Sequence, residues 1–298
     1  MTNAEEVVVL NATSLLADAL GRNLSEVFLR TFGGQEPHIA ALLDEAGRLV
    51  IERLASSDAL YHDAEHTALV TLVAQDILRG QRLRRTISAE DWLHFIVSAL
   101  THDIGYVRGV CQGDSLEQQV VDAAGAKIAL PPGASDAFLA PYHVERSKIA
   151  VRERFASHPV IDAERVARAI ELTRFPVPDD LDHAATDNEA GLLRAADLIG
   201  QLGDPLYLRK LSALFHEFAE TGVNDRLGYS SPADVAERYP RFFWSKVEPF
   251  IGDAILHLEL TMEGRQWIAN LYSHVFAIEH HLRRMGPQPG SVNPVAAR

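Results

Sequence analysis

Two histidines near residue 60 have the spacing of a helical pair. The segment Tyr61–His66 reads Tyr-His-Asp-Ala-Glu-His, so His62 and His66 lie four residues apart. On a helix they would sit one turn apart on the same face, and both imidazoles could point into one cleft. Imidazole binds metals and transfers protons near neutral pH, so this pair is a candidate for either chemistry.

Two aspartates have strongly apolar surroundings, where a carboxylate needs a counter-charge. His102-Asp103 directly follows the apolar run Trp92–Leu100, and the helical phase of that run places Asp103 on its buried face. Asp197 lies in a second apolar run. A buried carboxylate must be paired with a cation or bound to a metal ion. For Asp197 the alternative is an ion pair with Arg194, three residues earlier.

The order of these residues resembles that of a known enzyme family. His66, then His102-Asp103, then Asp197 is similar to the H…HD…D pattern of the HD superfamily of metal-dependent phosphohydrolases. Within it, the catalytic domains of cyclic nucleotide phosphodiesterases carry Tyr-His-Asn-x-x-His, which resembles the segment from Tyr61 to His66. They also carry Ala-Asp-Leu followed by a proline, and here Ala196-Asp197-Leu198 is followed by Pro205.

The resemblance implies a role for each matched residue. It implies that His66, His102, Asp103 and Asp197 hold a first metal, and that Asp103 bridges to a second. It also implies that His62 protonates the leaving oxygen, so that the catalytic residues would be His62 and Asp103. Imidazole with carboxylate suits Zn²⁺, Mn²⁺ or Fe²⁺, and a carboxylate-and-water site suits Mg²⁺ or Mn²⁺. The expected cofactors are one or two such divalent ions per chain.

The segment after His102-Asp103 departs from the phosphodiesterase pattern. Tyr106 stands where those enzymes have a second histidine that supports the second metal, so the number of metals remains open. Tyr106 is instead a candidate for the substrate pocket. His143, Arg146 and Lys148 lie at a predicted helix start and are candidates for a second metal or for phosphate contact.

A possible base-binding segment lies near the end of the chain. The phosphodiesterases carry Gln-x-x-Phe, with a proline seven residues after the Phe, and Phe242 is followed at that distance by Pro249. Aligned in this way, Phe242 matches the residue that stacks on the base and Tyr239 replaces the glutamine. A phenol cannot offer the paired donor and acceptor of an amide. The alternative is that this aromatic segment belongs to the core.

The elements that must position these residues are predicted to be helices. Apolar residues recur every three or four positions, whereas strand-like alternation is confined to Glu6–Leu10. Ser88, Asp162, Asn188 and Ser231 precede such runs and are predicted to cap helices. Helices are also expected over Leu60–Leu78 and from Gly264 to Arg283. The fold class is therefore all-α, and the resemblance implies an HD-domain helical bundle with additional N- and C-terminal helices.

One domain accounts for most of the chain. Residues 1–285 are predicted to form a single HD-type domain, in which residues 1–45 are a helical appendage. No repeat or linker divides this body. Residues 286–298 are rich in Pro, Gly and small side chains and are expected to form a disordered tail.

Composition limits the partners and the compartment. The 298 residues include 28 Lys and Arg against 41 Asp and Glu, a formal charge of −13, which disfavours nucleic acid and anionic membranes as partners. The single cysteine, Cys111, excludes an internal disulfide and a Cys-based zinc site. The first ten residues lack a secretory signal, and no apolar run reaches membrane-span length. A cytoplasmic protein is expected, and homo-oligomerisation remains open.

The function predicted from these patterns is hydrolysis of a small anionic phosphate ester. A phosphodiester such as a cyclic nucleotide is the first expectation, with His62 as general acid. The alternatives are a one-metal nucleotidase or phosphomonoesterase, and a di-iron oxygenase on the same scaffold that uses His143 and His183 as extra ligands. A non-catalytic HD module that senses a nucleotide is a fourth hypothesis.

Overall fold

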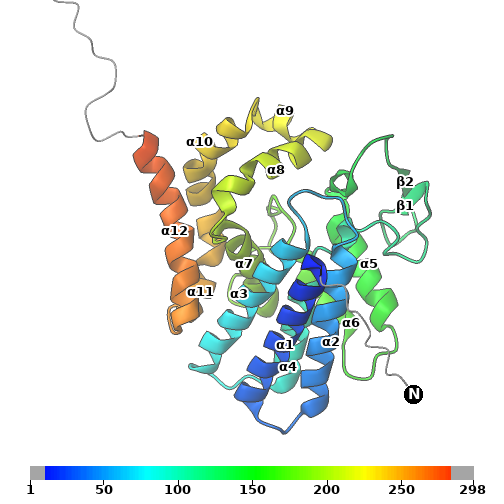
Figure 1. Cartoon of the computed structure of the whole chain (residues 1–298), viewed down its shortest axis with the longest axis vertical. Coiled ribbons are helices and arrows are strands. Elements are labelled where there is room, and N and C mark those ends of the chain that lie inside the picture. Colours follow the sequence, from blue (N-terminus) through cyan, green and yellow to red (C-terminus); the bar gives the residue numbers. More distant parts are fainter. Residues whose placement is uncertain (1–10, 283–298) are drawn as a thin grey trace, which may run out of the picture.

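The computed structural model describes residues 11–282, and within them almost every element is a helix (Figure 1). The predicted all-α class is therefore confirmed. The predicted strand at Glu6–Leu10 and the predicted disordered tail from residue 286 lie outside the described residues. Within the described part of the chain, no helix is both long and apolar enough to cross a bilayer.

The first half of the chain contains the helices that carry the histidine motifs. In chain order these are α1 (Ala12–Phe32), α2 (Pro37–Leu54), α3 (Ala64–Arg82), α4 (Ala89–Thr101) and the short 3₁₀ turn η1 (Ile104–Tyr106). A small excursion follows, made of β1 (Gln118–Val120), β2 (Lys127–Ala129) and a second 3₁₀ turn, η2 (Asp136–Leu139). The two strands form an antiparallel hairpin in which Gln119 is opposite Ile128.

The second half completes the bundle. Its helices are α5 (His143–Phe155), α6 (Ala163–Glu171), α7 (Glu189–Leu202), α8 (Tyr207–Glu220), α9 (Val223–Leu227), α10 (Pro232–Phe242), the π-helical segment η3 (Phe243–Val247), α11 (Glu248–Leu258) and α12 (Met262–Leu282). Figure 1 shows α3 and α7 near the centre of the molecule, with α8, α9 and α10 over one end of them.

The predicted helix caps are confirmed. Ser88 and Ser231 form capping boxes at the starts of α4 and α10, and each pairs with an aspartate three residues later. Asp162 and Asn188 accept hydrogen bonds from backbone N–H groups in the first turns of α6 and α7. Because the first N–H groups of a helix have no intrahelical acceptor, such side chains set where each helix begins.

Two positions in the motifs differ from the helical prediction. Helix α3 begins at Ala64 because the carboxylate of Asp63 accepts the N–H of His66 at 2.9 Å, so His62 precedes the helix. His62 and His66 therefore do not share a helix face. Helix α4 ends at Thr101, and Asp103 lies just beyond it with φ −105° and ψ 6°. The prediction that both residues lie within helices is wrong.

Close backbone contacts bring the motif-bearing elements together. A Cβ at Gly200 of α7 would lie 2.7 Å from the Cα of Val70 in α3, so this glycine allows the two helices to touch. A Cβ at Gly105 would lie 2.0 Å from the carbonyl oxygen of His143, so η1 rests directly on the start of α5. The two glycines thus fix the approach of Asp197 to His66 and of His143 to Asp103.

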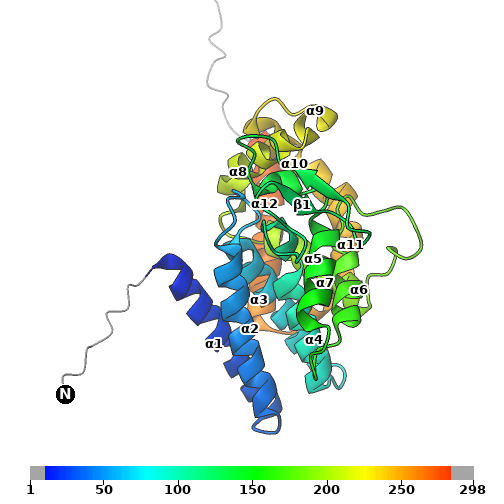
Figure 2. The same cartoon turned by 90° about the vertical axis from the view of Figure 1, so that its right-hand side faces the viewer.

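Helices α1 and α2 form a hairpin on one side of the bundle. Figure 2 shows α1 outermost, with α2 between it and the rest of the molecule. The hairpin buries Leu24, Phe28 and Leu43 completely. Helix α2 continues to Leu54, so the predicted boundary of the appendage at residue 45 falls inside this helix.

Candidate metal centre and adjoining cavity

Four predicted ligands from three parts of the chain converge on one point. His66 Nε2 lies 3.3 Å from Asp103 Oδ2 and 3.4 Å from Asp197 Oδ1. His102 Nε2 lies 3.3 Å and 3.6 Å from the same two oxygens. Ligand bonds of about 2 Å place neighbouring donors of a bound cation roughly 3–3.5 Å apart. The four histidine–carboxylate distances are therefore close to those between neighbouring donors of a coordination shell.

Local contacts orient these ligands. The ring of His102 is fully buried, and its Nδ1 lies 2.8 Å from the Ala99 carbonyl oxygen, to which it donates a hydrogen bond. The other nitrogen, Nε2, is then left with a lone pair directed at the carboxylates. A hydrogen bond at one imidazole nitrogen commonly sets the tautomer of a metal-binding histidine in this way. His66 is held in place by the cap that Asp63 provides to the first turn of α3.

Three of these buried atoms lack a hydrogen-bond partner. They are His66 Nε2, His102 Nε2 and Asp103 Oδ2. The three residues also form the one potential metal-binding group found among residues 11–282. Buried polar atoms in folded proteins are nearly always hydrogen-bonded, and a bound ion is one way to satisfy unpaired ones that face one another. The donor set thus fits a cation, as the spacing of the motifs predicts.

In the metal-free centre, the histidines and aspartates strongly shift one another's pKa values. Burial lowers the pKa of His66, but contact with Asp103 and Asp197 outweighs it and raises that pKa to about 9. Burial raises the pKa of Asp197, yet the two histidines lower it to about 2. The carboxylates are therefore ionised near neutral pH and attract positive charge, which either protons or a metal ion can supply.

The second oxygen of Asp103 faces another histidine. Asp103 Oδ1 lies 3.6 Å from His143 Nε2, while His143 Nδ1 donates to the Ala140 carbonyl at 2.6 Å. Burial lowers the pKa of His143 more than the nearby carboxylate raises it, which favours the neutral ring. Asp103 thus lies between the predicted first metal and a histidine that is suited to bind a second.

His62 is held by a carboxylate that the sequence patterns did not single out. Its Nδ1 donates to Glu217 Oε2 at 2.6 Å, and Glu217 Oε1 also accepts the backbone N–H of Tyr61 at 2.7 Å. Burial lowers the pKa of His62, but the charge and hydrogen bond of Glu217 outweigh it, so the net shift is upward. Glu217 lies in the apolar period of α8 and is buried. A carboxylate at an apolar position of this helix is the one sign in the sequence that could have identified Glu217.

Tyr106 lies between two of the candidate histidines. Its ring stacks on His62 with centroids 4.7 Å apart and an interplanar angle of 9°. On its other face it stacks on His143 at 4.6 Å and 22°. Tyr106 is buried and lines the cavity, as its assignment to the pocket predicts. The phenol keeps the two imidazoles apart and fixes the plane of each.

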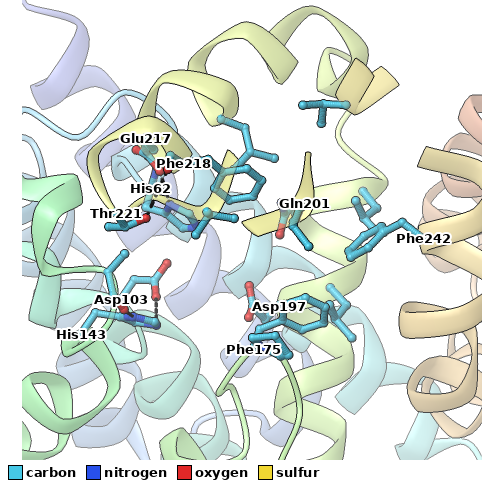
Figure 3. Close-up of a pocket in the computed structure, with 18 of the residues that line it drawn as sticks. His62, Asp103, His143, Phe175, Asp197, Gln201, Glu217, Phe218, Thr221 and Phe242 are labelled. Carbon is cyan, nitrogen blue, oxygen red and sulfur yellow. Dashed lines mark hydrogen bonds and ion pairs between the residues drawn. The ribbon is translucent and has the colours of Figure 1, made fainter. Parts of the chain in front are cut away.

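The centre opens into a cavity of about 440 Å³ that α7, α8, α9 and α10 surround. Figure 3 shows His62, Asp103 and His143 on one side of it and Phe242 on the other, with Gln201 toward Phe242. Ligand pockets commonly have volumes of about 300–1,000 Å³. The cavity is therefore large enough for a small organic ligand that reaches the candidate metal centre.

Both residues predicted from the aromatic segment line this cavity. Phe242 meets Phe175 edge to face, with ring centroids 5.7 Å apart. Tyr239 is 2% exposed, and its hydroxyl has no hydrogen-bond partner. The segment is thus both part of the core and part of the cavity wall, so the two alternatives for it are not exclusive.

Arg146 and Lys148 are placed away from the cavity lining. Arg146 is fully buried, where it pairs with Asp114 at 3.0 Å and donates to the carbonyl of Val120. Lys148 is bound by the carboxylates of Glu145 and Glu171. Because these donors are already occupied, the prediction that the two residues contact phosphate or a second metal is wrong.

Two alternatives left open by the sequence are also settled by placement. Arg194 donates to the carbonyls of His183 and Ala185 and lies 4.4 Å from the ring centroid of Phe250, so it is not the counter-charge of Asp197. His183 is outside the cavity lining, and its Nδ1 contacts Asp180 at 2.8 Å. The use of His183 as an extra ligand in the oxygenase hypothesis is therefore not supported.

Comparison with known proteins gives one match. The family described as Npun_R2479-like matches residues 10–281, which is nearly the whole chain. The chain belongs to the Npun_R2479-like family. All the residues of the candidate centre, and all those that line the cavity, fall inside the matched range. No curated protein and no solved structure gives a significant match.

Proposed function

We propose that the protein is a metal-dependent phosphohydrolase of the HD type, and that a phosphodiester is its first candidate substrate. The observation that carries this proposal is that the Nε2 atoms of His66 and His102 each lie 3.3–3.6 Å from one oxygen of Asp103 and one of Asp197, beside the cavity. Their order along the chain is that of the HD pattern, which supports the assignment to phosphate-ester chemistry.

The donor set defines the cation that it would hold. Two imidazole nitrogens and two carboxylate oxygens suit Zn²⁺, Mn²⁺ or Fe²⁺. When bound, such an ion supplies Lewis-acid polarisation of a phosphoryl oxygen and makes water nucleophilic near neutral pH. The residues themselves bring two negative charges, from Asp103 and Asp197, to the floor of the cavity, so an anionic substrate approaches only when cations neutralise them.

His62 is the proposed proton donor. Because its Nδ1 donates to Glu217, the proton of a charged His62 that is free to leave is on Nε2. His62 also lines the cavity beside Asp103. The upward shift of its pKa keeps the ring protonated at higher pH than an ordinary histidine. His62 can therefore donate a proton to the departing oxygen of an ester, while Glu217 holds the ring in place.

A phosphomonoesterase with one metal is the second candidate. It is favoured by Tyr106, which fills the space between His62 and His143. If the phenol leaves no room for a second ion, the reaction must proceed at the first centre alone. The contact between Asp103 Oδ1 and His143 at 3.6 Å favours two metals instead. A metal-to-protein ratio of one or two separates these forms of the same proposal.

The test combines metal analysis with a substrate panel. We expect the purified protein to retain a transition metal and to hydrolyse a phosphate ester from a panel of cyclic nucleotides, nucleoside monophosphates and generic aryl diesters, each assayed with Zn²⁺, Mn²⁺, Fe²⁺ and Mg²⁺. His102→Ala should lose both the metal and the activity. His216→Ala, an exposed histidine on α8, is the matched control and should lose neither.

Two results would contradict the proposal. Equal metal content in wild type, His102→Ala and Asp103→Ala would show that the four residues do not hold the ion. Bound iron with oxygen consumption and no ester hydrolysis would favour an oxygenase instead.

A further inference from the structure

Few of the residues that line the cavity carry a full charge. Asp103, Asp197 and Glu217 are the acids that line it, and all three belong to the candidate centre or contact His62. Among the described residues that line the cavity, Arg226 is the single Lys or Arg. It is exposed, it is in α9, and no carboxylate pairs with it in the described part of the chain. Most of the cavity lining therefore carries no formal charge.

Apolar side chains make up most of the cavity lining. Phe175 and Phe242 meet edge to face on one side, and Figure 3 shows Phe218 across the cavity from Phe175. Further aliphatic and aromatic residues from α7, α8 and α10 complete the wall, among them Leu198, Leu202, Leu214, Val235 and Tyr239. A wall of this kind gains free energy when it removes apolar ligand surface from water.

The same wall disfavours a highly charged ligand. A phosphate group that enters without a counter-charge loses its hydration and meets carboxylates at the inner end, which is unfavourable. The candidate centre can neutralise one phosphoryl group, and the exposed Arg226 can meet at most one further anion. A nucleoside triphosphate carries more phosphate groups than these two can match, and a nucleoside diphosphate or a cyclic dinucleotide would need both of them at once.

We infer that the substrate of this cavity is a phosphate ester with a bulky, uncharged and predominantly apolar organic group. This inference rests on the proposed function, because it places the reacting phosphoryl group at the candidate metal centre. The organic group then extends away from Asp197 along α7 and lies between Phe218 and the Phe175–Phe242 pair.

The test is a series of non-hydrolysable ligands that share one head group. Methylphosphonate, benzylphosphonate and naphthylmethylphosphonate are titrated into the metal-loaded full chain by calorimetry, and adenosine diphosphate serves as the polyanionic comparison. Burial of a side-chain-sized apolar group predicts a gain in affinity of roughly 10- to 100-fold from methyl to naphthylmethyl. The heat-capacity change of binding should become more negative along the series, as it does when apolar surface is buried.

Variants of the wall locate the binding mode. Phe218→Ala and Phe175→Ala should each reduce affinity for naphthylmethylphosphonate about 10-fold more than they reduce affinity for methylphosphonate. Phe276→Ala is the matched control, since Phe276 is 60% exposed on α12 and does not line the cavity. A thermal melt of each variant shows whether it is folded, and Phe175, which is 43% exposed, is the safer substitution.

Each outcome has a defined meaning. A flat affinity series, tighter binding of adenosine diphosphate than of naphthylmethylphosphonate, or equal losses in Phe276→Ala overturns the inference. If the size trend and its loss in Phe175→Ala are found but no ester is hydrolysed, the ligand class stands and the proposed hydrolysis fails. If esters are hydrolysed without any preference for apolar groups, the proposed function stands and this inference fails.

Discussion

At the scale of single residues, the carboxylate of Glu217 controls the chemistry available to His62. The hydrogen bond of 2.6 Å fixes which imidazole nitrogen faces the cavity, and the negative charge favours the protonated ring. Without Glu217, burial alone would favour the neutral ring, which cannot act as an acid. The proposed role of His62 therefore depends on a residue from a different helix, α8.

The first prediction is a change in the pH dependence of turnover. An acid must be protonated, so kcat should fall as pH rises through the raised pKa of His62. Glu217→Gln keeps a hydrogen-bonding side chain but removes the charge, which lowers that pKa and moves the alkaline limb of the kcat profile to lower pH. His62→Asn should lower kcat by roughly 10²- to 10⁴-fold. The measurement is a pH–rate profile with a substrate that has a poor leaving group.

The control for this prediction is Glu237→Gln, because Glu237 is exposed on α10 and is not in the cavity lining. Its profile should match that of the wild type. An activated ester, whose leaving group needs no proton, should be much less sensitive to His62→Asn. Loss of bound metal from His62→Asn would instead assign His62 as a ligand.

Arg146 illustrates how a candidate binding residue becomes a structural one. Its guanidinium is entirely buried beside Asp114, and it donates to three backbone carbonyls, those of Gly105, Val107 and Val120. Since one of these carbonyls belongs to Gly105 in η1, the arginine ties the β-hairpin region to the turn that follows Asp103. Its effect on the site is therefore through the backbone.

The second prediction is that Arg146→Met strongly destabilises the fold. It leaves Asp114 buried without a counter-charge, which costs about 3–5 kcal/mol of unfolding free energy. Arg152→Met, on the same helix, removes an exposed pair with Glu164 and should cost about 1 kcal/mol or less. Denaturant unfolding of both variants measures the difference. Similar losses of unfolding free energy in the two variants would show that the buried pair contributes no more to stability than the exposed one.

At the scale of elements, the contact between α3 and α7 determines whether the four ligands meet. Asp197 and Gly200 are on α7, and Gly200 is where that helix touches Val70 of α3. Helix packing at this distance leaves no room for a side chain at Gly200, because two of the three atoms nearest to an added Cβ are backbone atoms of Val70. The separation of the two helices sets the distance from Asp197 to His66, which lies in the first turn of α3.

The third prediction compares two helical glycines. Gly252→Ala on α11 places a Cβ in open space and should stabilise the protein by about 0.5–1 kcal/mol through helix propensity. Gly200→Ala gains the same propensity but forces α3 and α7 apart, so it should destabilise by about 1–3 kcal/mol. Thermal or denaturant unfolding measures both changes. Metal affinity should fall in Gly200→Ala alone, and equal effects of the two substitutions would contradict this account.

At the scale of the whole molecule, the cation is predicted to contribute to folding. A centre with two carboxylates and two imidazoles, drawn from three separate segments, forms only when the bundle closes. An ion that binds the folded chain better than the unfolded chain stabilises it by mass action. Protons can replace the ion only over a limited pH range.

The fourth prediction concerns the chelated protein. The pKa of His66 is raised from 6.5 to about 9 in the metal-free fold, so protonation contributes stability that is complete below pH 6.5. That stability is lost as pH rises through about 9. The thermal midpoint of chelated protein should therefore fall between pH 6.5 and pH 9. Metal-loaded protein should hold its midpoint better over that range, because metal binding needs neutral imidazole and strengthens as pH rises.

Thermal melts with and without chelator at the two pH values provide the measurement. His102→Ala should behave like the chelated wild type whether or not metal is added. A metal-loaded midpoint that falls as steeply as the chelated one would contradict the assignment of these residues as ligands.

The sequence by itself determined the helical class and the residue types at the centre. Helix period and caps are local properties, so Ser88, Asp162, Asn188 and Ser231 marked the starts of their helices correctly. The two aspartates could also be selected locally, because a carboxylate next to an apolar helix needs a counter-charge wherever the helix lies. The complete ligand set, with His66 and His102, was predicted from the resemblance of the residue order to the H…HD…D pattern.

Tertiary structure alone decided which charges were already satisfied. Lys148 and Arg146 have the chemistry of phosphate ligands, but their partners Glu171 and Asp114 come from other segments and occupy their donors. Glu217 lies 155 residues from His62, and no local pattern links the two. Hydrogen bonds and ion pairs depend on which side chains face one another after the helices pack. Residue type and spacing therefore predict what a side chain can do, and its packed neighbours determine what it is free to do.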